Sequence, residues 1–175
     1  MRKALFLDRD GIVNIDHGYV SRVEDFEFSD GIFKLIHLFQ KKDYLIFIVT
    51  NQSGIARGYY SEEDFKTLTL WMIKSFKLHD IRINDVYHCP HAPKDNCNCR
   101  KPATGMIEDN FKKYNIDLKN SWMIGDKQSD IDFATNAKIE QSISIGSRDI
   151  INSSHHFNTI SKCASFLEKN QHIIK

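Results

Sequence analysis

Short runs of mostly apolar residues recur along the chain and are separated by longer amphipathic segments. The runs cover residues 3–7, 44–50, 84–88, 121–126 and 141–146. Runs of this length are typical of strands, and a lack of strict alternation indicates strands buried on both faces, as in a parallel sheet. We therefore predict five parallel strands.

The longer segments have the spacing of helices. In residues 31–42, the side chains of Ile32, Leu35 and Phe39 fall on one helical face. A second helix is predicted to begin at Ser61, because a hydroxyl followed by acidic residues suits a helix N-terminus. Strands that alternate with helices specify an open α/β fold. Further helices are predicted at residues 104–114, 129–137 and 161–170.

Composition and charge narrow the class of protein. The chain has 175 residues, of which 41% are hydrophobic and 27% charged, and this favours one compact soluble domain over residues 1–175. A net charge of +1 gives no overall field that would attract nucleic acid or an anionic membrane. The longest apolar run is far shorter than the roughly 20 residues of a membrane span. We predict a cytoplasmic monomer with no nucleic-acid or membrane partner.

Polar residues follow four of the predicted strands. Because the carboxyl ends of parallel strands meet in one crevice, we expect these side chains to converge. Each of them alone could be an ordinary turn or cap residue. Three carboxylates at one point repel unless a cation lies among them, and Mg²⁺ with carboxylate, water and phosphate ligands is the natural ion. The residues are Asp8, Asp10, Thr50, Asn51, Arg100, Lys101, Asp126 and Lys127.

Four segments resemble, in order, the motifs of the haloacid-dehalogenase (HAD) superfamily of phosphohydrolases. They are DRDG at 8–11, TNQSG at 50–54, CRKP at 99–102 and GDKQSD at 125–130. With NIDHGYV at 14–20, they resemble its histidinol-phosphatase-like subfamily, which includes heptose-bisphosphate phosphatases. The resemblance covers about residues 3–146 and implies a HAD-like Rossmannoid fold of three layers. The short segment between Asp10 and Gly31 leaves no space for a large cap domain.

The resemblance assigns roles to individual residues. Asp8 would attack phosphorus and form an aspartyl-phosphate, and Asp10 would act as general acid and then as general base. Mg²⁺ would be bound by Asp8, the backbone carbonyl of Asp10 and Asp126. Asp130 would either orient Lys127 or a metal-bound water, or be a solvated acid on a helix face. The phosphoryl oxygens would be held by Thr50, Asn51, Arg100 and Lys101.

Arg9 lies between the two candidate catalytic carboxylates. If strand alternation continues past residue 8, its side chain points away from Asp8 and Asp10. We therefore expect a structural or salt-bridging role for Arg9.

A cysteine-rich loop at about residues 88–102 has the ligands of a closed tetrahedral zinc site. The ligands would be Cys89, His91, Cys97 and Cys99, with His88 as a possible substitute. A redox centre is the alternative, but the loop lacks the C-x-x-C spacing of thioredoxin-like sites. Four protein ligands leave no open position for substrate, so we predict a structural Zn²⁺ that positions the Arg100-Lys101 pair.

The loops that match the subfamily are the candidate specificity elements. Arg57 could meet a second phosphate or sugar hydroxyls. The resemblance implies Mg²⁺-dependent removal of one phosphate from a small phosphorylated sugar, a heptose bisphosphate used for lipopolysaccharide or another surface polysaccharide. Histidinol phosphate is the alternative substrate, because the short zinc loop fits it equally well, and a zinc-organised nucleic-acid-binding module is a remote third reading. The predicted substrate-binding residues are Asp16, His17, Gly18, Tyr19, Gln52, Ser53, Arg57 and Lys127.

Overall fold

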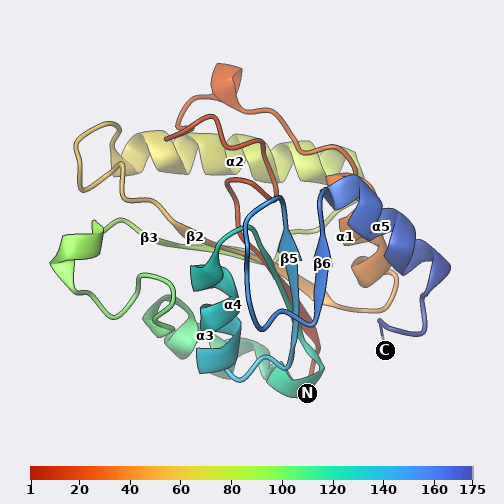
Figure 1. Ribbon diagram of the computed structural model, residues 1–175. Helices are drawn as coiled ribbons and strands as arrows, with labels where there is room; N and C mark the ends of the chain where they lie inside the picture. The colour runs from red at the N-terminus through yellow and green to blue at the C-terminus, as the bar shows by residue number, and fades with distance from the viewer. Residues whose placement is uncertain (175) are drawn as a thin grey trace.

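A six-stranded sheet forms the centre of the computed structural model (Figure 1). The structure describes residues 1–174, and for residues 109–112 it describes the backbone alone. The strand order is β3-β2-β1-β4-β5-β6, and all neighbouring strands are parallel. The chain therefore runs outward from β1 in one direction and from β4 in the other. The strands are β1 (Ala4–Leu7), β2 (Leu45–Asn51), β3 (Asp85–Cys89), β4 (Trp122–Gly125), β5 (Gln141–Ile145) and β6 (His155–Phe157).

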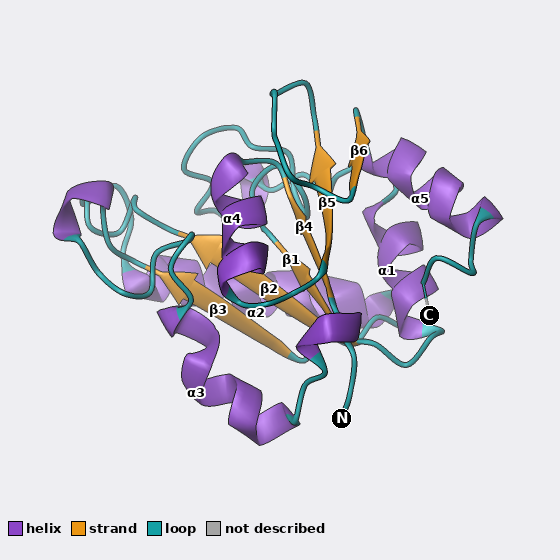
Figure 2. Ribbon diagram, turned by 60° about the horizontal axis from the view of Figure 1, so that its bottom comes forward, coloured by secondary structure: helices purple, strands orange, loops and turns teal. Residues whose placement is uncertain are grey.

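Helices cover both faces of the sheet, as Figure 2 shows, and this confirms the predicted three-layer α/β fold. One face packs against α1, α2 and α5, and the other against α3 and α4. The helices are α1 (Ile32–Gln40), α2 (Glu62–Leu78), α3 (Gly105–Tyr114), α4 (Gln128–Asn136) and α5 (Ile160–Lys169).

Strand β1 shows why the apolar runs form a central sheet. Its four residues are all fully buried. Leu5 and Leu7 pack in the cluster that contains α1, α2 and α5, whereas Ala4 and Phe6 pack in the cluster on the opposite face. A strand covered on both faces requires an uninterrupted apolar run, because every side chain enters a core.

The prediction of strands and helices was largely right, with one omission. Strand β6 was not predicted, because His155–Phe157 contains a single apolar residue and no apolar run. The predicted start of α2 is confirmed, since Ser61 Oγ accepts a hydrogen bond from the Asp64 backbone. Between β1 and α1 the described chain has the short 3-10 helix η1 (Val23–Asp25) and turns, with no inserted cap domain. Within the described residues, no helix has the length and apolar character needed to cross a bilayer.

Candidate active site and candidate zinc site

Three buried carboxylates meet at the carboxyl ends of β1 and β4. Asp8 directly follows β1, Asp126 directly follows β4, and Asp130 lies in the first turn of α4. One oxygen of each lies within 4.8 Å of the others, and their exposure is 4%, 8% and 0%. Gly11 permits this approach, because a Cβ there would lie 2.6 Å from Asp126 Cγ. The predicted convergence of strand ends is therefore present.

Lys101 joins two of these carboxylates from the loop after β3. Its Nζ lies 2.8 Å from Asp8 Oδ1 and 2.7 Å from Asp130 Oδ1, and it donates to the Val49 carbonyl. Burial alone would lower the pKa of Lys101, but attraction to Asp130 and Asp8 outweighs burial and raises it. Asn51 holds the lysine backbone, accepting from Lys101 N at 2.9 Å and donating to Lys101 O at 3.1 Å. The lysine is therefore a fixed, charged partner of Asp8.

Burial disfavours the ionised form of two carboxylates in the cluster. Burial raises the pKa of Asp8, and repulsion from Asp130 adds to this although Lys101 opposes it. Burial and repulsion from Asp8 also raise the pKa of Asp126, against the attraction of Lys127 and Arg148. Asp126 Oδ1 is buried and has no hydrogen-bond partner among the described residues. Hard oxygen ligands fit Mg²⁺, and Asp126 Oδ1 is such an oxygen without a hydrogen-bond partner, so the residues present suit the predicted ion.

Arg9 pairs with Asp10, so the prediction that its side chain points away from Asp10 was wrong. Arg9 Nη2 lies 2.9 Å from both oxygens of Asp10 and donates to the Val20 carbonyl. The predicted salt-bridging role is confirmed, with Asp10 as the partner. The strand ends at Leu7 and the chain turns at Arg9, so strand alternation no longer sets the side-chain direction.

Two amides complete the surroundings of Asp10. Asn14 Nδ2 donates to Asp10 Oδ1 at 3.0 Å, and Gln52 Nε2 donates to Asp10 Oδ2 at 2.9 Å. Gln52 Nε2 also donates to Thr50 Oγ1 at 2.8 Å, and Gln52 Oε1 accepts a short hydrogen bond from Tyr60. The structure thus places Gln52, a predicted substrate ligand, against the predicted general acid Asp10 and the predicted phosphate ligand Thr50.

Asp130 is fully buried, so the alternative of a solvated helix-face acid was wrong. Its Oδ2 accepts hydrogen bonds from the backbone N–H groups of Asp126 and Lys127, at 3.1 and 3.0 Å. Gly125 leaves the space for this carboxylate, because a Cβ there would lie 2.2 Å from Asp130 Cβ. Asp130 therefore fixes the backbone at the end of β4 while its other oxygen faces Lys101.

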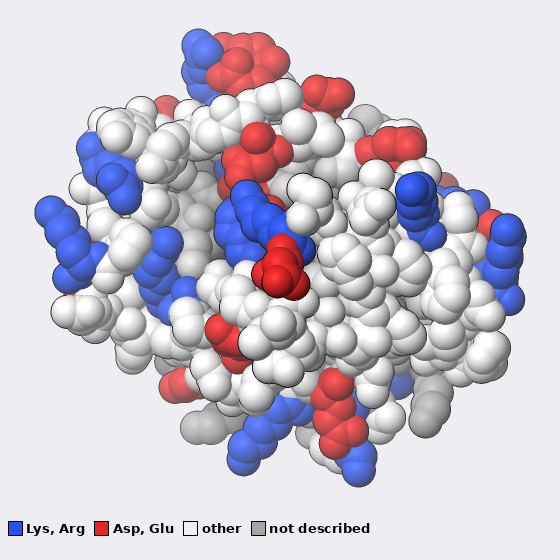
Figure 3. Space-filling model, viewed as in Figure 1, with Lys and Arg blue, Asp and Glu red and all other residues white. Residues whose placement is uncertain are grey.

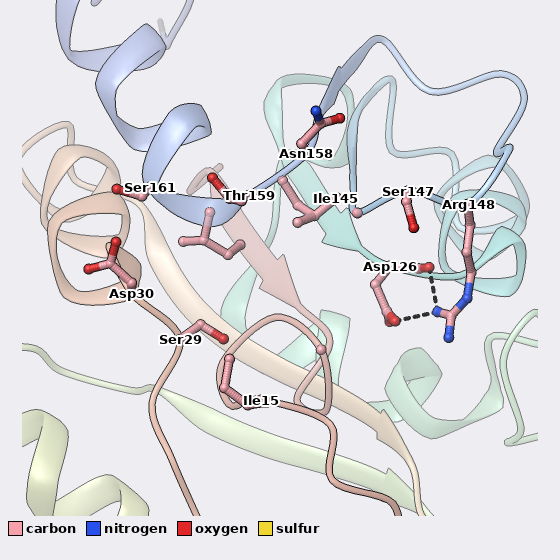
Figure 4. A pocket seen from close by; sticks show the side chains of 13 residues that line it. Ile15, Ser29, Asp30, Asp126, Ile145, Ser147, Arg148, Asn158, Thr159 and Ser161 are labelled. Carbon is pink, nitrogen blue, oxygen red and sulfur yellow. Dashed lines mark hydrogen bonds and ion pairs between the residues drawn. The ribbon is translucent and has the colours of Figure 1, made fainter.

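Arg148 is a site residue that the sequence analysis missed. Its Nη1 donates to the backbone carbonyl of Asp126 and to Asp126 Oδ2, from the loop between β5 and β6 (Figure 4). The contact lies at the edge of a cavity of about 440 Å³. A signal was available, since Arg148 closely follows a predicted strand, as the other site residues do.

A second cavity, of about 310 Å³, lies beside Asp10. Lys127 Nζ lies 3.6 Å from Asp16 Oδ2 and 3.6 Å from Asp126 Oδ1, so it links this cavity to the carboxylate cluster. Basic side chains lie next to acidic ones near the middle of the face in Figure 3. The residues lining the cavity are Asp10, Asp16, Gly18, Tyr19, Asn51, Gln52, Ser53, Tyr60, Arg100, Lys127 and Ser129.

Two predicted substrate residues lie away from this cavity. His17 is exposed and pairs with Glu27 at 3.3 Å, beside a neighbouring hollow. Arg57 is also exposed, and it is not among the residues that line either cavity. Their predicted contacts with substrate stay predictions.

The four predicted zinc ligands converge after β3. The sulfur atoms of Cys89, Cys97 and Cys99 lie 3.0–3.6 Å apart, and His91 Nδ1 lies 3.2 Å from Cys99 Sγ. A tetrahedral zinc with Zn–S bonds of about 2.3 Å requires sulfur separations of roughly 3.8 Å, so small adjustments would fit the ion. None of these cysteines forms a disulfide. His88 instead pairs with Glu62 at 2.8 Å, so the substitute-ligand alternative was wrong.

The zinc loop is tied to the active-site cation pair. Arg100 Nη1 donates to the backbone carbonyl of His91 at 3.2 Å, and Arg100 lines the cavity beside Asp10. Burial opposes ionisation of Cys97, but a backbone hydrogen bond from Arg100 and its thiol neighbours lower the pKa of Cys97 to about 7. Burial raises the pKa of Cys89 and Cys99, so a bound cation would be needed to hold all three thiols as thiolates, the form that binds metal.

The fold and the buried aspartate–lysine pair at the strand ends define a hydrolase of the HAD type, and a family model described as HAD-hydrolase-like matches residues 98–143. The chain is 54% identical, over 137 residues, to D-glycero-alpha-D-manno-heptose-1,7-bisphosphate 7-phosphatase of Campylobacter jejuni, covering 78% of each chain. It therefore belongs to the heptose-1,7-bisphosphate 7-phosphatase family, a family of phosphatases.

Two further comparisons agree. The chain is 49% identical, over 142 residues, to D-glycero-beta-D-manno-heptose-1,7-bisphosphate 7-phosphatase of Helicobacter pylori, covering 81% of this chain and 82% of that one. A crystal structure of D,D-heptose 1,7-bisphosphate phosphatase from B. bronchiseptica, complexed with magnesium and phosphate, has a similar fold. Its TM-score is 0.82 at 24% identity, covering 96% of this chain and 99% of that one.

Proposed function

We propose that the protein is a Mg²⁺-dependent phosphomonoesterase that removes the 7-phosphate of D-glycero-D-manno-heptose 1,7-bisphosphate. Its product would enter the synthesis of nucleotide-activated heptose for lipopolysaccharide or another surface polysaccharide. The observation that carries the reaction class is the buried Asp8 carboxylate held by Lys101 at the strand ends. Relatives named for that substrate, at 43–54% identity, support its identity. They include alpha- and beta-anomer enzymes, so the proposal covers both anomers.

Asp8 and Asp10 carry the covalent chemistry. An oxygen of Asp8 attacks phosphorus, and the bond from phosphorus to the sugar oxygen breaks with its electron pair on that oxygen. The sugar oxygen takes the proton of Asp10 as it departs. Water then attacks the aspartyl-phosphate, Asp10 takes a proton from the water, and Asp8 is released with inorganic phosphate.

The surrounding cations and donors offset the charge of the phosphoryl group. Lys101 already lies on Asp8, and Arg100, Thr50 and Asn51 lie at the same strand ends to contact phosphoryl oxygens. Bound to Asp8, Asp126 and the Asp10 carbonyl, Mg²⁺ would neutralise charge that develops on those oxygens.

Zn²⁺ is proposed for the Cys89, His91, Cys97 and Cys99 cluster, with a structural role, because four protein ligands fill a tetrahedral site. We also propose one domain over residues 1–175, a monomeric state and a cytoplasmic location. We propose no nucleic-acid or membrane partner.

A comparison of substrates tests the function. Specificity constants would be measured for both anomers of the heptose 1,7-bisphosphate and for histidinol phosphate. We expect the better anomer to exceed histidinol phosphate by about 100-fold or more, because a site built for polar substrate groups discriminates strongly against ligands that lack them. A higher specificity constant for histidinol phosphate would replace the proposed substrate and keep the reaction class.

A further inference from the structure

Tyr60 is a buried residue beside the active site that no sequence motif singled out. Its side chain is 9% exposed, and its hydroxyl donates a short hydrogen bond to Gln52 Oε1. The ring packs against Gly54, where a Cβ would lie 2.2 Å from a ring carbon. Burial is the main reason that the pKa of Tyr60 is raised to about 12, so the hydroxyl keeps its proton near neutral pH. Tyr60 is therefore a fixed hydrogen-bond donor.

Asp10 and Tyr60 together fix one orientation of the Gln52 amide. The two ends of a glutamine amide have nearly the same shape, but one accepts and the other donates. An ionised Asp10 only accepts, so the nitrogen end faces Asp10 Oδ2 and Thr50 Oγ1, at 2.9 and 2.8 Å, and Tyr60 holds the oxygen end by donating to it. Gln52 is 2% exposed, so water does not compete for these contacts.

Both partners of the amide nitrogen belong to the proposed chemistry. Asp10 Oδ1 accepts from Arg9 and Asn14, and Asp10 Oδ2 accepts from Arg9 and from Gln52, which directly follows β2. These donors together fix the plane of the carboxylate. Thr50 Oγ1 accepts from Gln52, which leaves the hydroxyl proton of Thr50 for another acceptor such as a phosphoryl oxygen.

We propose that Tyr60 is a positioning residue that acts through Gln52 to orient the carboxylate of Asp10 for proton transfer and the hydroxyl of Thr50 for phosphate binding. The inference rests on the proposed function, because it takes Asp10 as the general acid. It goes beyond that function by placing part of the proton-transfer geometry on a residue that is neither a proposed catalytic group nor a proposed metal ligand.

Tyr60→Phe is the direct test, because it removes the hydroxyl and keeps the ring against Gly54. We expect kcat for the heptose bisphosphate to fall about tenfold, which corresponds to the loss of one buried hydrogen bond, with KM changed less than about threefold. Turnover of p-nitrophenyl phosphate should fall less than that of the heptose bisphosphate, because nitrophenolate leaves without a proton and only the general-base step of Asp10 is affected. A purely structural defect would slow both substrates equally.

A second variant and a matched control complete the design. Gln52→Glu replaces the donor that faces Asp10 with a carboxylate, so the selective loss on the sugar phosphate should exceed that of Tyr60→Phe. Tyr59→Phe is the control, since Tyr59 is 61% exposed and no hydrogen bond of its hydroxyl is found among the described residues. It should leave both rates unchanged.

Equal losses on the two substrates, or no loss with Tyr60→Phe, would overturn the inference. Failure of the wild-type protein to hydrolyse either substrate would contradict the proposed function instead. If the wild-type protein hydrolyses p-nitrophenyl phosphate but not the heptose bisphosphate, the proposed substrate is wrong. In that case, glycerol phosphate, which also has a poor leaving group, would replace the heptose bisphosphate in the comparison with p-nitrophenyl phosphate.

Discussion

The carboxylate cluster and the zinc-ligand cluster are built in opposite ways. Asp8 lies more than 100 residues before Asp126 and Asp130, and all three are almost completely buried. The zinc ligands all lie within residues 89–99, and His91 among them is exposed. The first cluster uses hard oxygen ligands beside the buried cation Lys101, whereas the second uses soft sulfur ligands in an irregular loop.

The difference shows where each cluster obtains its order. Hydrogen bonding between β1 and β4 brings the ends of these two strands together. The carboxylates that follow them therefore meet when the sheet forms. The zinc loop follows the edge strand β3 and contains little regular structure besides the 3-10 helix η2 (Pro93–Asp95), so we expect the proposed Zn²⁺ to stabilise it. The two sites meet at Arg100 and Lys101, since Arg100 contacts the His91 backbone and Lys101 contacts Asp8.

Asp8→Asn separates the two sites most sharply. We expect phosphatase turnover to fall about 10⁴-fold or more, because the amide is not a nucleophile, while zinc content stays at the wild-type level. Steady-state hydrolysis and atomic absorption would measure the two quantities. Asp80→Asn is the matched control at an exposed position with a left-handed backbone that asparagine tolerates. Retained turnover in Asp8→Asn would refute the assignment of the nucleophile.

Cys99→Ser attacks the other cluster. We expect zinc content to fall, the free energy of unfolding to decrease by about 2–4 kcal/mol, and KM for the phosphorylated substrate to rise, because the loop no longer fixes Arg100. Metal analysis, denaturant unfolding and kinetics would measure these changes. Cys163→Ala is the control, since Cys163 is a buried thiol on α5, far along the chain from the zinc loop. Loss of zinc with unchanged KM would show that the two sites are independent.

The pH dependence of magnesium stabilisation gives the smallest effect. The pKa of Asp126 in the folded metal-free protein is raised above its usual 3.8. At pH values between the usual and the raised pKa, the folded state therefore binds more protons than the unfolded state. The stability of the metal-free protein should therefore fall as pH rises through the raised pKa. Mg²⁺ binds the ionised carboxylates, so its stabilising effect should grow over the same interval, to about 1–3 kcal/mol near neutral pH.

Thermal unfolding with and without added Mg²⁺, from about pH 4 to about pH 7, would measure this trend. Magnesium should be omitted rather than chelated, because a chelator would also remove zinc. Asp126→Asn should lose most of the pH-dependent magnesium effect. Stabilisation by Mg²⁺ of equal size at every pH would contradict the prediction that Mg²⁺ binds the ionised form of Asp126.

The sequence predicted the site residues whose positions follow directly from strand ends. Asp8 and Asp126 were found because the strand pattern identifies where each strand stops. Arg9 was misread because the chain turns immediately after Asp8, which cancels the strand alternation. Arg148 was missed although it also follows a strand, because its partner Asp126 lies 22 residues earlier along the chain.

The parallel α/β sheet and the four candidate zinc ligands could be predicted from the sequence alone. Both follow from local information, namely apolar runs long enough for buried strands and four metal ligands within eleven positions. Tertiary structure decided which charges pair. Lys101 binds Asp8 across 93 residues, and Gln52 reaches Asp10 across 42. Such contacts depend on strand order and on side-chain directions after turns, and the spacing of residues along a chain specifies neither.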